Sequence, residues 1–533
     1  MPTKGAVNFH DGPLPRYAGL NAPVWALIAG EERHGITWHM IEGGIDEGDI
    51  LQQRLFDIAP TDTALTLNAK CYAAAIDSFP ALAEALTTGA PARQAQDLSQ
   101  SSYFGLHTRP DIAGRLDFTR PATTLNAHIR ALDHGDYWNP LVQPKFELAG
   151  RVVLTTKAAL AEGQGAPGTV LSVGDGQITV ATGAGALSVS RITDCTGAPV
   201  AVERLVKPGD ILPSATPEQA AAVNAATATA IKAEPYWRKL VETLSPAILP
   251  LSGADTGEVA EQNVALPAGI SADQAFAAMA LLAGRLCETA NVDCAWRDAD
   301  TDHGAPAGYV APWVPVRVDA SGTVNEAMTG FATSLDKARR FGGYPSDMTA
   351  RLPSKLRLAT PHMGLTDQPA LVPGTVLTLS MTDGTATLRA NTARLPETML
   401  TLMAARLEKL LSEFATLTTQ SAKTLDIMPQ AERTLVLHDW NATKVEYNQT
   451  LCIHQMFERQ VAKTPDATAL VFEGDALSYA ELNARSNQVA HVLREMGVKP
   501  GTLVGLYTQR SPSLLIGALG ILKAGGADRK SVV

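Results

Sequence analysis

The chain has 533 residues and a formal net charge of -10, with 45% hydrophobic and 18% charged residues. At roughly 100–200 residues per domain, this length predicts about three to five domains, and the composition excludes a globally disordered chain. The acidic balance argues against a nucleic-acid partner, which usually requires a basic face.

No apolar run reaches the roughly 18 residues of a membrane-spanning helix, so no membrane partner is expected. The N-terminal sequence has no apolar stretch of the kind that follows the lysine of a signal peptide. The cysteines are scattered and form no Cys-x-x-Cys pair, which argues against a disulfide scaffold and a cysteine zinc site. These features predict a cytoplasmic protein.

The first 92 residues combine a short apolar segment, a proline-rich turn and a long amphipathic stretch. Apolar residues recur at helical spacing over Ala64–Thr88. Asp62 and Thr63 are plausible caps for this helix, and Pro80 is expected to kink or divide it. A strand, a loop and a helix in this order predict an α/β unit.

From about residue 110 to 207 the pattern changes to short alternating runs. Predicted strands cover Arg151–Thr155, Gly168–Val173 and Gln177–Ala181, separated by glycine-containing turns. This region predicts a small β-barrel. Residues 208–245 are expected to link it to the next region, because their alanine-rich part (213–235) is typical of an exposed linker or a connecting helix.

Residues 246–430 predict a second α/β layer, in which helices alternate with strands. The predicted helices are Asp273–Thr289, Val324–Phe341 and Pro396–Thr418, and the strands are Val314–Val318 and Thr375–Met381. Beyond residue 431 the predicted elements are a helix over Ile453–Thr464, the stretches Leu477–Gly497 and Leu514–Lys523, and a strand over Thr502–Tyr507.

The densest cluster of polar residues lies near the start of the chain. Asn8 and His10 are two residues apart, so on a strand their side chains share a face, and Asp46 follows in a glycine-rich loop. These residue types suit the transfer of an acyl group to an amine. Asn and His can donate hydrogen bonds to a developing oxyanion, and a His beside a carboxylate can move the amine proton. The same residues are also common in structural roles, since Asp often stabilises a glycine-rich turn.

A longer pattern extends through this cluster: Asn-x-His, a Leu-Pro-Arg turn, a His-Gly-x-Thr element and a Gly-x-Asp-x-Gly loop, within NFHDGPLPRYAGLNAPVWALIAGEERHGITWHMIEGGIDEGDI. It resembles the folate-dependent formyltransferase family, which includes methionyl-tRNA formyltransferase and the formylation domains of peptide synthetases. The resemblance implies that Asn8, His10 and Asp46 are catalytic. Asn8 and His10 would stabilise the tetrahedral intermediate, and Asp46 would support His10 and proton transfer.

The same resemblance implies 10-formyltetrahydrofolate as the formyl donor, with Glu42, Gly43, Gly44 and Ile45 lining its pterin site. No metal is expected for this reaction. Residues 1–92 would form a partial, N-terminally truncated Rossmann-like catalytic domain, and residues 110–207 the family's barrel-like (OB-like) C-terminal subdomain. His34 and His39 have no metal-ligand spacing, so both are assigned structural roles.

Residues 246–430 weakly resemble the C-terminal half of a peptide-synthetase condensation domain, through AFAAMALLAGRL, YVAPWVPVRVDA, LDKARRF and LPETMLTLMAARLEKLLSEF. The catalytic element of that family, two adjacent histidines followed by Asp-Gly, is absent from the sequence, since none of the eleven His residues is adjacent to another. This half domain is therefore expected to serve structure or carrier docking rather than condensation.

Residues 431–527 resemble the truncated start of an amino-acid adenylation domain, through the motif LSYAEL at 477–482 and LKAGGA at 522–527. ATP and Mg²⁺ would be needed only by a part of that domain outside this sequence. The last six residues, DRKSVV, are interpreted as a sequence artefact, because they back-translate to a string like a sequencing adapter.

Together these resemblances imply formyl transfer to the amine of an amino acid or of a carrier-bound aminoacyl group in nonribosomal peptide biosynthesis, with other synthetase modules as partners. A stand-alone methionyl-tRNA formyltransferase-like enzyme is one alternative, although the acidic charge counts against a tRNA partner. A catalytically inactive synthetase fragment is the other.

Overall fold

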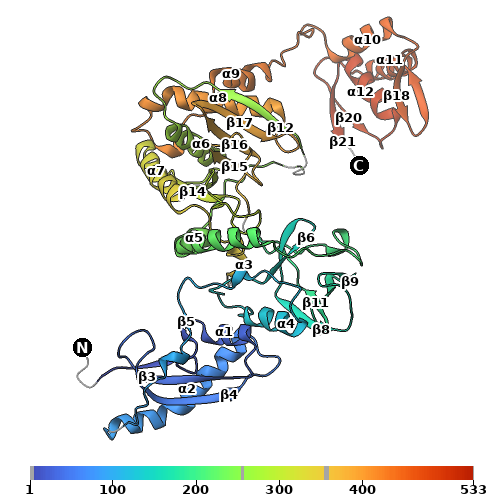
Figure 1. The fold of residues 1–533 in the computed structure, drawn as a ribbon. Coiled ribbons are helices and arrows are strands. Elements are labelled where there is room, and N and C mark those ends of the chain that lie inside the picture. The colour runs from blue at the N-terminus through green and yellow to red at the C-terminus, as the bar shows by residue number, and fades with distance from the viewer. Residues whose placement is uncertain (1–4, 90, 252, 254–256, 353–358, 532–533) are drawn as a thin grey trace. The chain divides into compact units, whose positions relative to one another are not determined.

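The computed structural model describes residues 5–89, 91–251, 253, 257–352 and 359–531. The chain divides into two compact units, Met1–Arg433 and Thr434–Val533, which are described separately (Figure 1). No helix within the described ranges is both long and apolar enough to cross a membrane.

The first region of the larger unit is a three-stranded sheet with the order β1-β3-β4. Its strands are β1 (Val7–His10), β3 (Arg33–Met40) and β4 (Ile50–Asp57). Both strand pairs are antiparallel, whereas a Rossmann-like sheet is built on parallel pairs. For β3 and β4 the reason is their connection, a loop over residues 41–49 that is too short for the crossover that parallel strands need.

Two helices pack with this sheet: α1 (Ala22–Ala29) and α2 (Ala64–Thr87). The predicted cap of α2 is confirmed, since Thr63 is its N-cap and exchanges capping hydrogen bonds with Thr66. Pro80 lies inside α2, and the helix continues through it undivided. Figure 1 shows α2 lying along the sheet, and two aromatic contacts join them: Phe9 to Tyr72 and Trp38 to Phe79.

The second region confirms the predicted strands within a β-rich subdomain. A four-stranded antiparallel sheet has the order β8-β11-β10-β9, and β6 and β7 form a separate hairpin. The ladders among the described residues do not join these two groups into one continuous barrel. The elements of this region are α3 (Asp111–Gly114), α4 (Ala122–Ala131), β6 (Lys145–Leu148), β7 (Arg151–Leu154), β8 (Lys157–Ala161), β9 (Val170–Gly174), β10 (Gln177–Ala181) and β11 (Ala186–Ser190). Before them, β5 (Tyr103–Phe104) pairs in parallel with β2 (Ala18–Gly19) of the first region.

The alanine-rich segment is a long helix, α5 (Pro217–Glu242), capped at Thr216. It is the connecting helix rather than the exposed linker, because one face is buried along its length, from Val223 through Ala230 to Trp237. Small alanine side chains let neighbouring segments approach the helix closely, so low hydrophobic bulk does not imply exposure.

The third region is a six-stranded mixed sheet with the order β12-β17-β16-β15-β13-β14. The predicted helix Val324–Phe341 is confirmed as α7, and the other predicted helices are confirmed with shorter ends. Helix α6 is buried from Ala275 to Gly284, as expected for a helix enclosed on all sides. The elements are β12 (Val259–Val264), α6 (Ala272–Leu286), β13 (Asn291–Arg297), β14 (Val314–Asp319), α7 (Val324–Phe341), β15 (Met363–Thr366), β16 (Leu377–Thr382), β17 (Thr385–Asn391), α8 (Glu397–Glu413) and α9 (Gln430–Thr434).

A buried group of charges ties the second and third regions together. Asp347 accepts hydrogen bonds from Lys145 Nζ (2.7 Å) and Arg351 Nε (3.1 Å). Arg351 also donates to Glu234 Oε1 of α5 at 2.9 Å. Burial alone would raise the pKa of Asp347, but the charges of Lys145 and Arg351 outweigh it and hold that pKa below its usual value.

The described part of the smaller unit begins with a π-helix over Leu435–Asp439 and continues with two short sheets and three α-helices: α10 (Ile453–Lys463), β18 (Thr468–Phe472), β19 (Asp475–Ser478), α11 (Tyr479–Glu495), β20 (Leu503–Tyr507), α12 (Pro512–Ala524) and β21 (Ala527–Ser531). Its predicted elements are confirmed. Of the segment interpreted as an artefact, 528–531 belong to β21, which pairs in parallel with β20, and 532–533 lie outside the described residues.

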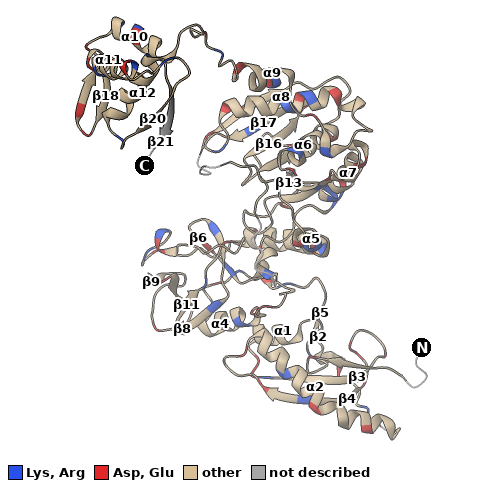
Figure 2. Cartoon of the chain, turned by 180° about the vertical axis from the view of Figure 1, so that it is seen from behind, with Lys and Arg blue, Asp and Glu red and all other residues tan. Residues whose placement is uncertain are grey.

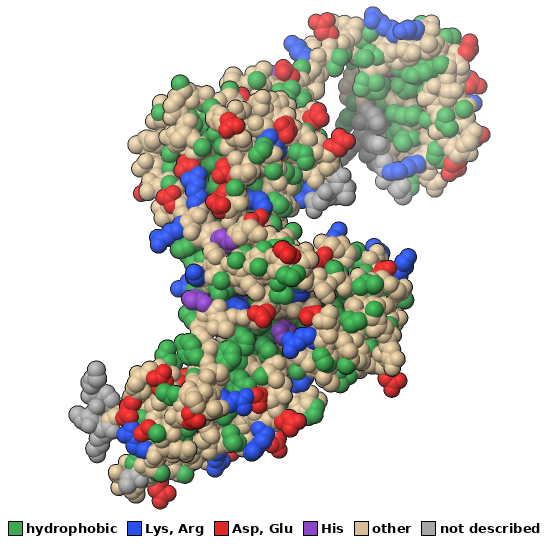
Figure 3. All heavy atoms as spheres, viewed as in Figure 1, with side chains coloured by type: hydrophobic (Ala, Val, Ile, Leu, Met, Phe, Trp, Pro, Cys, Tyr) green, Lys and Arg blue, Asp and Glu red, His purple; other side chains and the backbone are tan. Residues whose placement is uncertain are grey.

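Charged side chains of both signs are mixed over the surface. Figure 2 shows Lys and Arg scattered among Asp and Glu along the chain, and on the face drawn in Figure 3 the blue and red side chains are interspersed.

Candidate functional site

The predicted residues Asn8, His10 and Asp46 lie together on one face of the first sheet. In the β1–β3 ladder Asn8 is paired with His39 and His10 with Thr37. Because side chains alternate along a strand, these four point to the same face. The loop between β3 and β4 then returns Asp46 to that face, so residues distant in sequence form one polar cluster.

Asp46 is the centre of this cluster. Its Oδ2 accepts the backbone N–H of Gly19 at 2.8 Å and lies 3.4 Å from His10 Nδ1. Its Oδ1 lies 3.3 Å from His39 Nε2 and 3.5 Å from Asn8 Nδ2. The side chain is 9% exposed, and its residue has a positive φ of 59°. The carboxylate is therefore fixed from several sides in a nearly dry position.

The backbone carbonyls around the two histidines settle which ring nitrogens carry protons. A carbonyl can only accept, so His10 Nε2, 2.8 Å from the Tyr17 carbonyl, must donate. His10 Nδ1 then faces Asp46 Oδ2 at 3.4 Å. His39 Nδ1 donates to the Met40 carbonyl at 2.9 Å, while its Nε2 lies 3.2 Å from Asn8 Nδ2 and 3.3 Å from Asp46 Oδ1.

The environment keeps Asp46 ionised. Burial would raise its pKa, but hydrogen bonds from His39 and Gly19 and the nearby charges of His10 and His39 outweigh burial and lower the pKa below its usual value. The neighbouring Asp11 behaves in the opposite way, because burial dominates and raises its pKa. Of the two carboxylates, Asp46 is therefore the one that is charged at rest and can accept a proton during the reaction.

The proline-rich turn supplies the backbone groups of the site. Thr37 on β3 fastens it, because its hydroxyl donates to the Gly12 carbonyl (2.7 Å) and accepts from the Leu14 N–H (3.1 Å). A Cβ at Gly12 would lie 2.8 Å from His10 Nε2, so glycine is required for the His10 ring to fit. The turn thereby presents the Tyr17 carbonyl to His10 and leads on to the N–H of Gly19.

His34 has the structural role that was predicted for it. The side chain is 1% exposed, and Nε2 lies 2.8 Å from the Asp11 carbonyl. Tyr17 and Phe56 pack edge-on against the ring, and burial lowers its pKa to about 4. A neutral, enclosed imidazole is suited to packing rather than proton transfer.

His39 was assigned a structural role from the sequence, and the structure places it within the cluster. The ring is 2% exposed, contacts both Asn8 and Asp46, and holds them relative to each other. The signal that could have found it was the strand pairing. In the antiparallel β1–β3 ladder His39 lies opposite Asn8.

The loop predicted to bind the pterin, Glu42–Ile45, is exposed beside the cluster. Glu42 pairs with Arg93, and the N–H of Gly44 donates to Glu47. The side chains of Ile41 and Ile45 are 60% and 61% exposed. Two exposed isoleucines that flank glycine backbone make a surface on which a flat apolar ring can lie.

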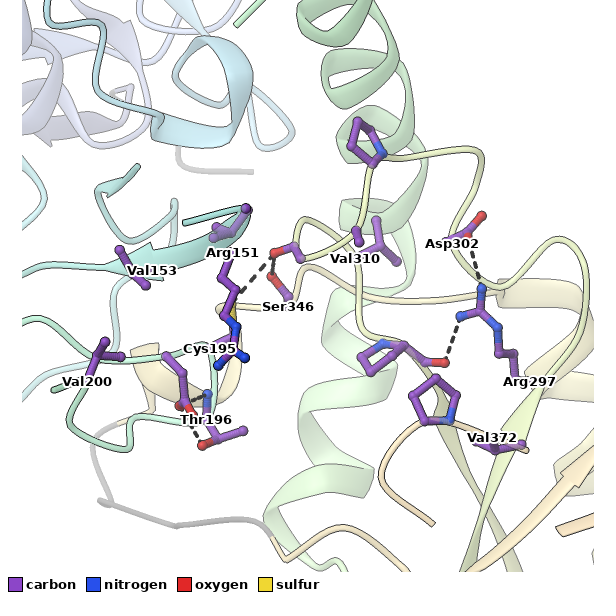
Figure 4. Close-up of a pocket in the computed structure, with 18 of the residues that line it drawn as sticks. Arg151, Val153, Cys195, Thr196, Val200, Arg297, Asp302, Val310, Ser346 and Val372 are labelled. Carbon is purple, nitrogen blue, oxygen red and sulfur yellow. Dashed lines mark hydrogen bonds and ion pairs between the residues drawn. The ribbon is translucent and has the colours of Figure 1, made fainter. Parts of the chain in front are cut away.

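A separate cavity lies between the β-rich subdomain and the six-stranded sheet (Figure 4). Its volume is about 940 Å³, and its wall includes Arg151 and Cys195 on one side and Arg297 and Val372 on the other. None of the Asn8 cluster lines it. Within the described ranges, no three His, Cys, Asp or Glu side chains form a group that could hold a metal ion.

Comparison with known proteins identifies three segments of the chain. Residues 1–82 match the formyl transferase model, residues 111–207 match the formyl transferase C-terminal domain, and residues 457–528 match the AMP-binding enzyme model. The chain thus joins formyl transferase segments to an AMP-binding segment.

Curated relatives are peptide synthases. A component of the linear gramicidin synthase of Brevibacillus parabrevis is 48% identical over 122 residues, which is 23% of this chain and 2% of that protein. Bacitracin synthase 3 of Bacillus licheniformis is 50% identical over 109 residues, or 20% of this chain and 2% of that protein. The chain therefore spans only about 2% of the length of these relatives.

Similar solved structures come from both kinds of protein. An N-formyltransferase from Helicobacter canadensis, in complex with folinic acid and dTDP-3-aminofucose, has a TM-score of 0.30 at 20% identity, covering 35% of this chain and 66% of that chain. The nonribosomal peptide synthetase FmoA3 has a TM-score of 0.35 at 19% identity, covering 56% of this chain and 37% of that chain. TM-scores this low do not establish a shared fold.

Proposed function

We propose that the Asn8 cluster transfers a formyl group from 10-formyltetrahydrofolate to the amine of an amino acid, free or bound to a carrier protein, during nonribosomal peptide biosynthesis. The observation that carries this proposal is the contact of Asp46 with His10, His39 and Asn8 on one face of the sheet. The match of two segments to formyl transferase models supports the reaction class. The AMP-binding segment and the peptide-synthase relatives support the acceptor class.

The reaction requires a base for the attacking amine. The amine lone pair forms the new C–N bond to the formyl carbon, the bond from that carbon to the donor nitrogen breaks, and one proton moves from the amine to the departing nitrogen. The His10–Asp46 pair is placed to carry that proton, because Asp46 is ionised and lies 3.4 Å from His10 Nδ1.

The oxyanion that develops on the formyl group needs a hydrogen-bond donor. We assign this role to the side-chain amide of Asn8, which His39 holds at 3.2 Å and whose second N–H would turn to the oxyanion from its long 3.5 Å contact with Asp46. Both ring nitrogens of His10 already have partners, the Tyr17 carbonyl and Asp46. A direct contact of His10 with the oxyanion would require the hydrogen bond to Tyr17 to break, so we assign His10 to proton transfer.

The formyl donor fits the exposed loop beside the cluster. Its pterin would lie against Ile41 and Ile45, with the glycine backbone of residues 43 and 44 allowing close approach. When bound there, it supplies the formyl carbon, and the protein supplies orientation and proton transfer.

The division into domains is part of this proposal. We assign residues 1–92 and 110–207 to the two parts of a formyltransferase, with an OB-like second part, and residues 246–430 to a condensation-like half domain. Residues 431–527 would begin an adenylation domain whose ATP and Mg²⁺ site lies outside this sequence. Other synthetase modules would be the protein partners, and a cytoplasmic location remains a prediction.

The test is to incubate the whole chain with 10-formyltetrahydrofolate and each proteinogenic amino acid, and to detect N-formyl products by mass spectrometry. A second series presents the same amino acids as carrier-protein thioesters. A formylated product that disappears in Asn8→Ala supports the proposal. Formation of no product in either series, although folinic acid binds the chain, would contradict it.

A further inference from the structure

The Asn8 cluster is also held from outside its own sheet, by the joining segment (residues 93–104) between the first region and the β-rich subdomain. The N–H and the carbonyl of Gln94 both pair with the backbone of Ile50, at 2.9 and 2.8 Å. This bridge fixes the joining segment beside the loop between β3 and β4. It brings Gln96 against the part of that loop that carries Asp46.

The side chain of Gln96 is bonded to the backbone of this loop at two points. Its Nε2 donates to the carbonyl of Asp46 at 2.8 Å and to the carbonyl of Gly48 at 2.6 Å. A carbonyl can only accept, so the amide nitrogen of Gln96 and not its oxygen must face the loop. The Oε1 atom is buried and has no hydrogen-bond partner within the described part of the chain. Gln96 therefore acts on the loop as a donor.

The loop needs such an external support. Residues 41–45 and 47 are exposed, so packing contributes little to its conformation. Asp46 has a φ of 59°, in the left-handed region that residues other than glycine rarely adopt. A backbone of this kind persists only where its surroundings hold it in place. The two hydrogen bonds from the joining segment supply that hold.

The joining segment also holds the other half of the site, the proline-rich turn. The N–H of Tyr17 donates to Ser102 Oγ at 2.8 Å. The carbonyl of Tyr17 accepts from His10 Nε2, and the N–H of Gly19, two residues further on, donates to Asp46 Oδ2. One segment therefore contacts both of the loops between which the His10–Asp46 pair lies.

We propose that Gln96 is a positioning residue for formyl transfer, which sets the carboxylate of Asp46 against His10. This inference rests on the proposed function, and Gln96 lies outside both predicted formyltransferase domains (1–92 and 110–207). Without its two hydrogen bonds the loop can shift and take Asp46 with it. A misplacement of about 1 Å at a reacting group is enough to lower a rate by roughly 10²-fold.

The first experiment measures hydrogen exchange of the whole chain at single-residue resolution, so it does not depend on turnover. The Gly19 amide donates to Asp46 Oδ2, whereas the amides of Ala18 and Leu20 donate to backbone carbonyls of the joining segment at 2.8 Å. Gln96→Met keeps the length of the side chain and removes its donors. Exchange at Gly19 should then accelerate by at least about tenfold, the effect of losing a hydrogen bond to a charged group. Exchange at Ala18 and Leu20 should not change. Equal acceleration at all three amides, or at none, would overturn the proposal.

The second experiment measures formyl transfer by the same proteins. Gln96→Met should lower kcat by at least about tenfold with little change in the KM for 10-formyltetrahydrofolate, because the loss falls on the reacting group. Gln96→Lys restores a donor to both carbonyls and should recover most of the rate and of the exchange protection at Gly19. Gln100→Met is the matched control and should behave as the wild type, since Gln100 is an exposed glutamine of the same segment.

The two experiments separate this proposal from the proposed function. A loss confined to KM, or a kcat in Gln96→Lys as low as in Gln96→Met, would contradict the positioning role. If the wild type transfers no formyl group, the proposed function fails, and the exchange pattern at Gly19 still decides whether Gln96 holds Asp46 in place.

Discussion

Asn8 of β1 and His39 of β3 face each other across an antiparallel ladder, and their side chains meet with 3.2 Å between Asn8 Nδ2 and His39 Nε2. The contact is directional, because the other nitrogen of His39 is committed to the Met40 carbonyl. His39 is thereby a positioning residue: it orients the amide that we assign to the oxyanion, and it also contacts Asp46.

Replacement of His39 tests this role. His39→Leu should lower kcat for formyl transfer by roughly 10–100-fold, the range that corresponds to about 1.5–3 kcal/mol for a hydrogen bond to a charged group. His39→Gln should recover part of the loss, because its amide oxygen can accept from Asn8. Steady-state rates and melting temperatures of both variants are the measurements. Equal losses in the two variants at equal melting temperatures would show that the side chain only fills space.

The buried His34 predicts a pH dependence of stability. Burial lowers its folded pKa from 6.5 to about 4, so the unfolded chain takes up the proton first as the pH falls. The contribution of His34 to the free energy of unfolding is complete above pH 6.5 and declines between pH 6.5 and 4. It amounts to about 3 kcal/mol in total. Urea unfolding of the wild type and His34→Gln at pH 7.5 and pH 5 measures it.

The variant should reduce this slope without removing it, because burial also lowers the pKa of His128 and His134 to about 4. His107→Gln is the matched control, since that side chain is exposed and should leave the slope unchanged. If His34→Gln keeps the full wild-type slope, then His34 is not the buried neutral base described.

The buried ion pairs of Asp347 predict a large loss of stability when this side chain is replaced. Asp347→Ala leaves Lys145 without its carboxylate inside the protein and should lower the free energy of unfolding by about 3–5 kcal/mol. The double variant Lys145→Met with Asp347→Leu should recover most of the loss, because it removes both charges. Asp302→Asn, at a half-exposed ion pair, is the control and should cost less than about 1 kcal/mol. Similar unfolding curves for Asp347→Ala and Asp302→Asn would contradict the buried network.

The exposed loop at Ile45 predicts how folate binds. Folinic acid at about 100 times its dissociation constant should stabilise the wild type by about 2.7 kcal/mol. Ile45→Asp should abolish most of this stabilisation, since a charge would replace the apolar contact with the pterin. Ile211→Asp, at an apolar residue that is 67% exposed in the β-rich subdomain, is the control. The same thermal shift in all three proteins would place the folate elsewhere.

Much of this architecture could be predicted from periodicity and capping alone. Helix α7 has the bounds that the pattern of apolar residues predicts, and the strand Gln177–Ala181 is reproduced as β10. These are local signals, which the sequence contains directly. The side-chain cluster of Asn8, His10 and Asp46 was also predicted, but through a family pattern, because residue types alone left a structural reading open.

The sequence predictions that differ from the structure concern contacts between segments that are distant in the chain. The parallel, Rossmann-like sheet expected for the first region is antiparallel, and that pairing is what brings His39 to Asn8. The alanine-rich segment left an exposed linker and a connecting helix open, and the structure shows the helix, because burial of one face of α5 depends on partners distant in the sequence, such as Arg351. Non-local contacts of this kind produce no periodic pattern in the sequence, so they cannot be predicted from it.

The most direct test of the central proposal compares two aspartates of one loop. Asp46→Asn removes the charge that contacts His10, whereas Asp49→Asn changes a more exposed carboxylate that pairs with Arg93. The measurement is the rate of amine-dependent release of tetrahydrofolate from 10-formyltetrahydrofolate. Asp46→Asn should lower this rate by roughly 10²–10⁴-fold, the usual contribution of a general base, while Asp49→Asn stays near the wild type. A wild-type rate in Asp46→Asn would contradict the assignment of the cluster to formyl transfer.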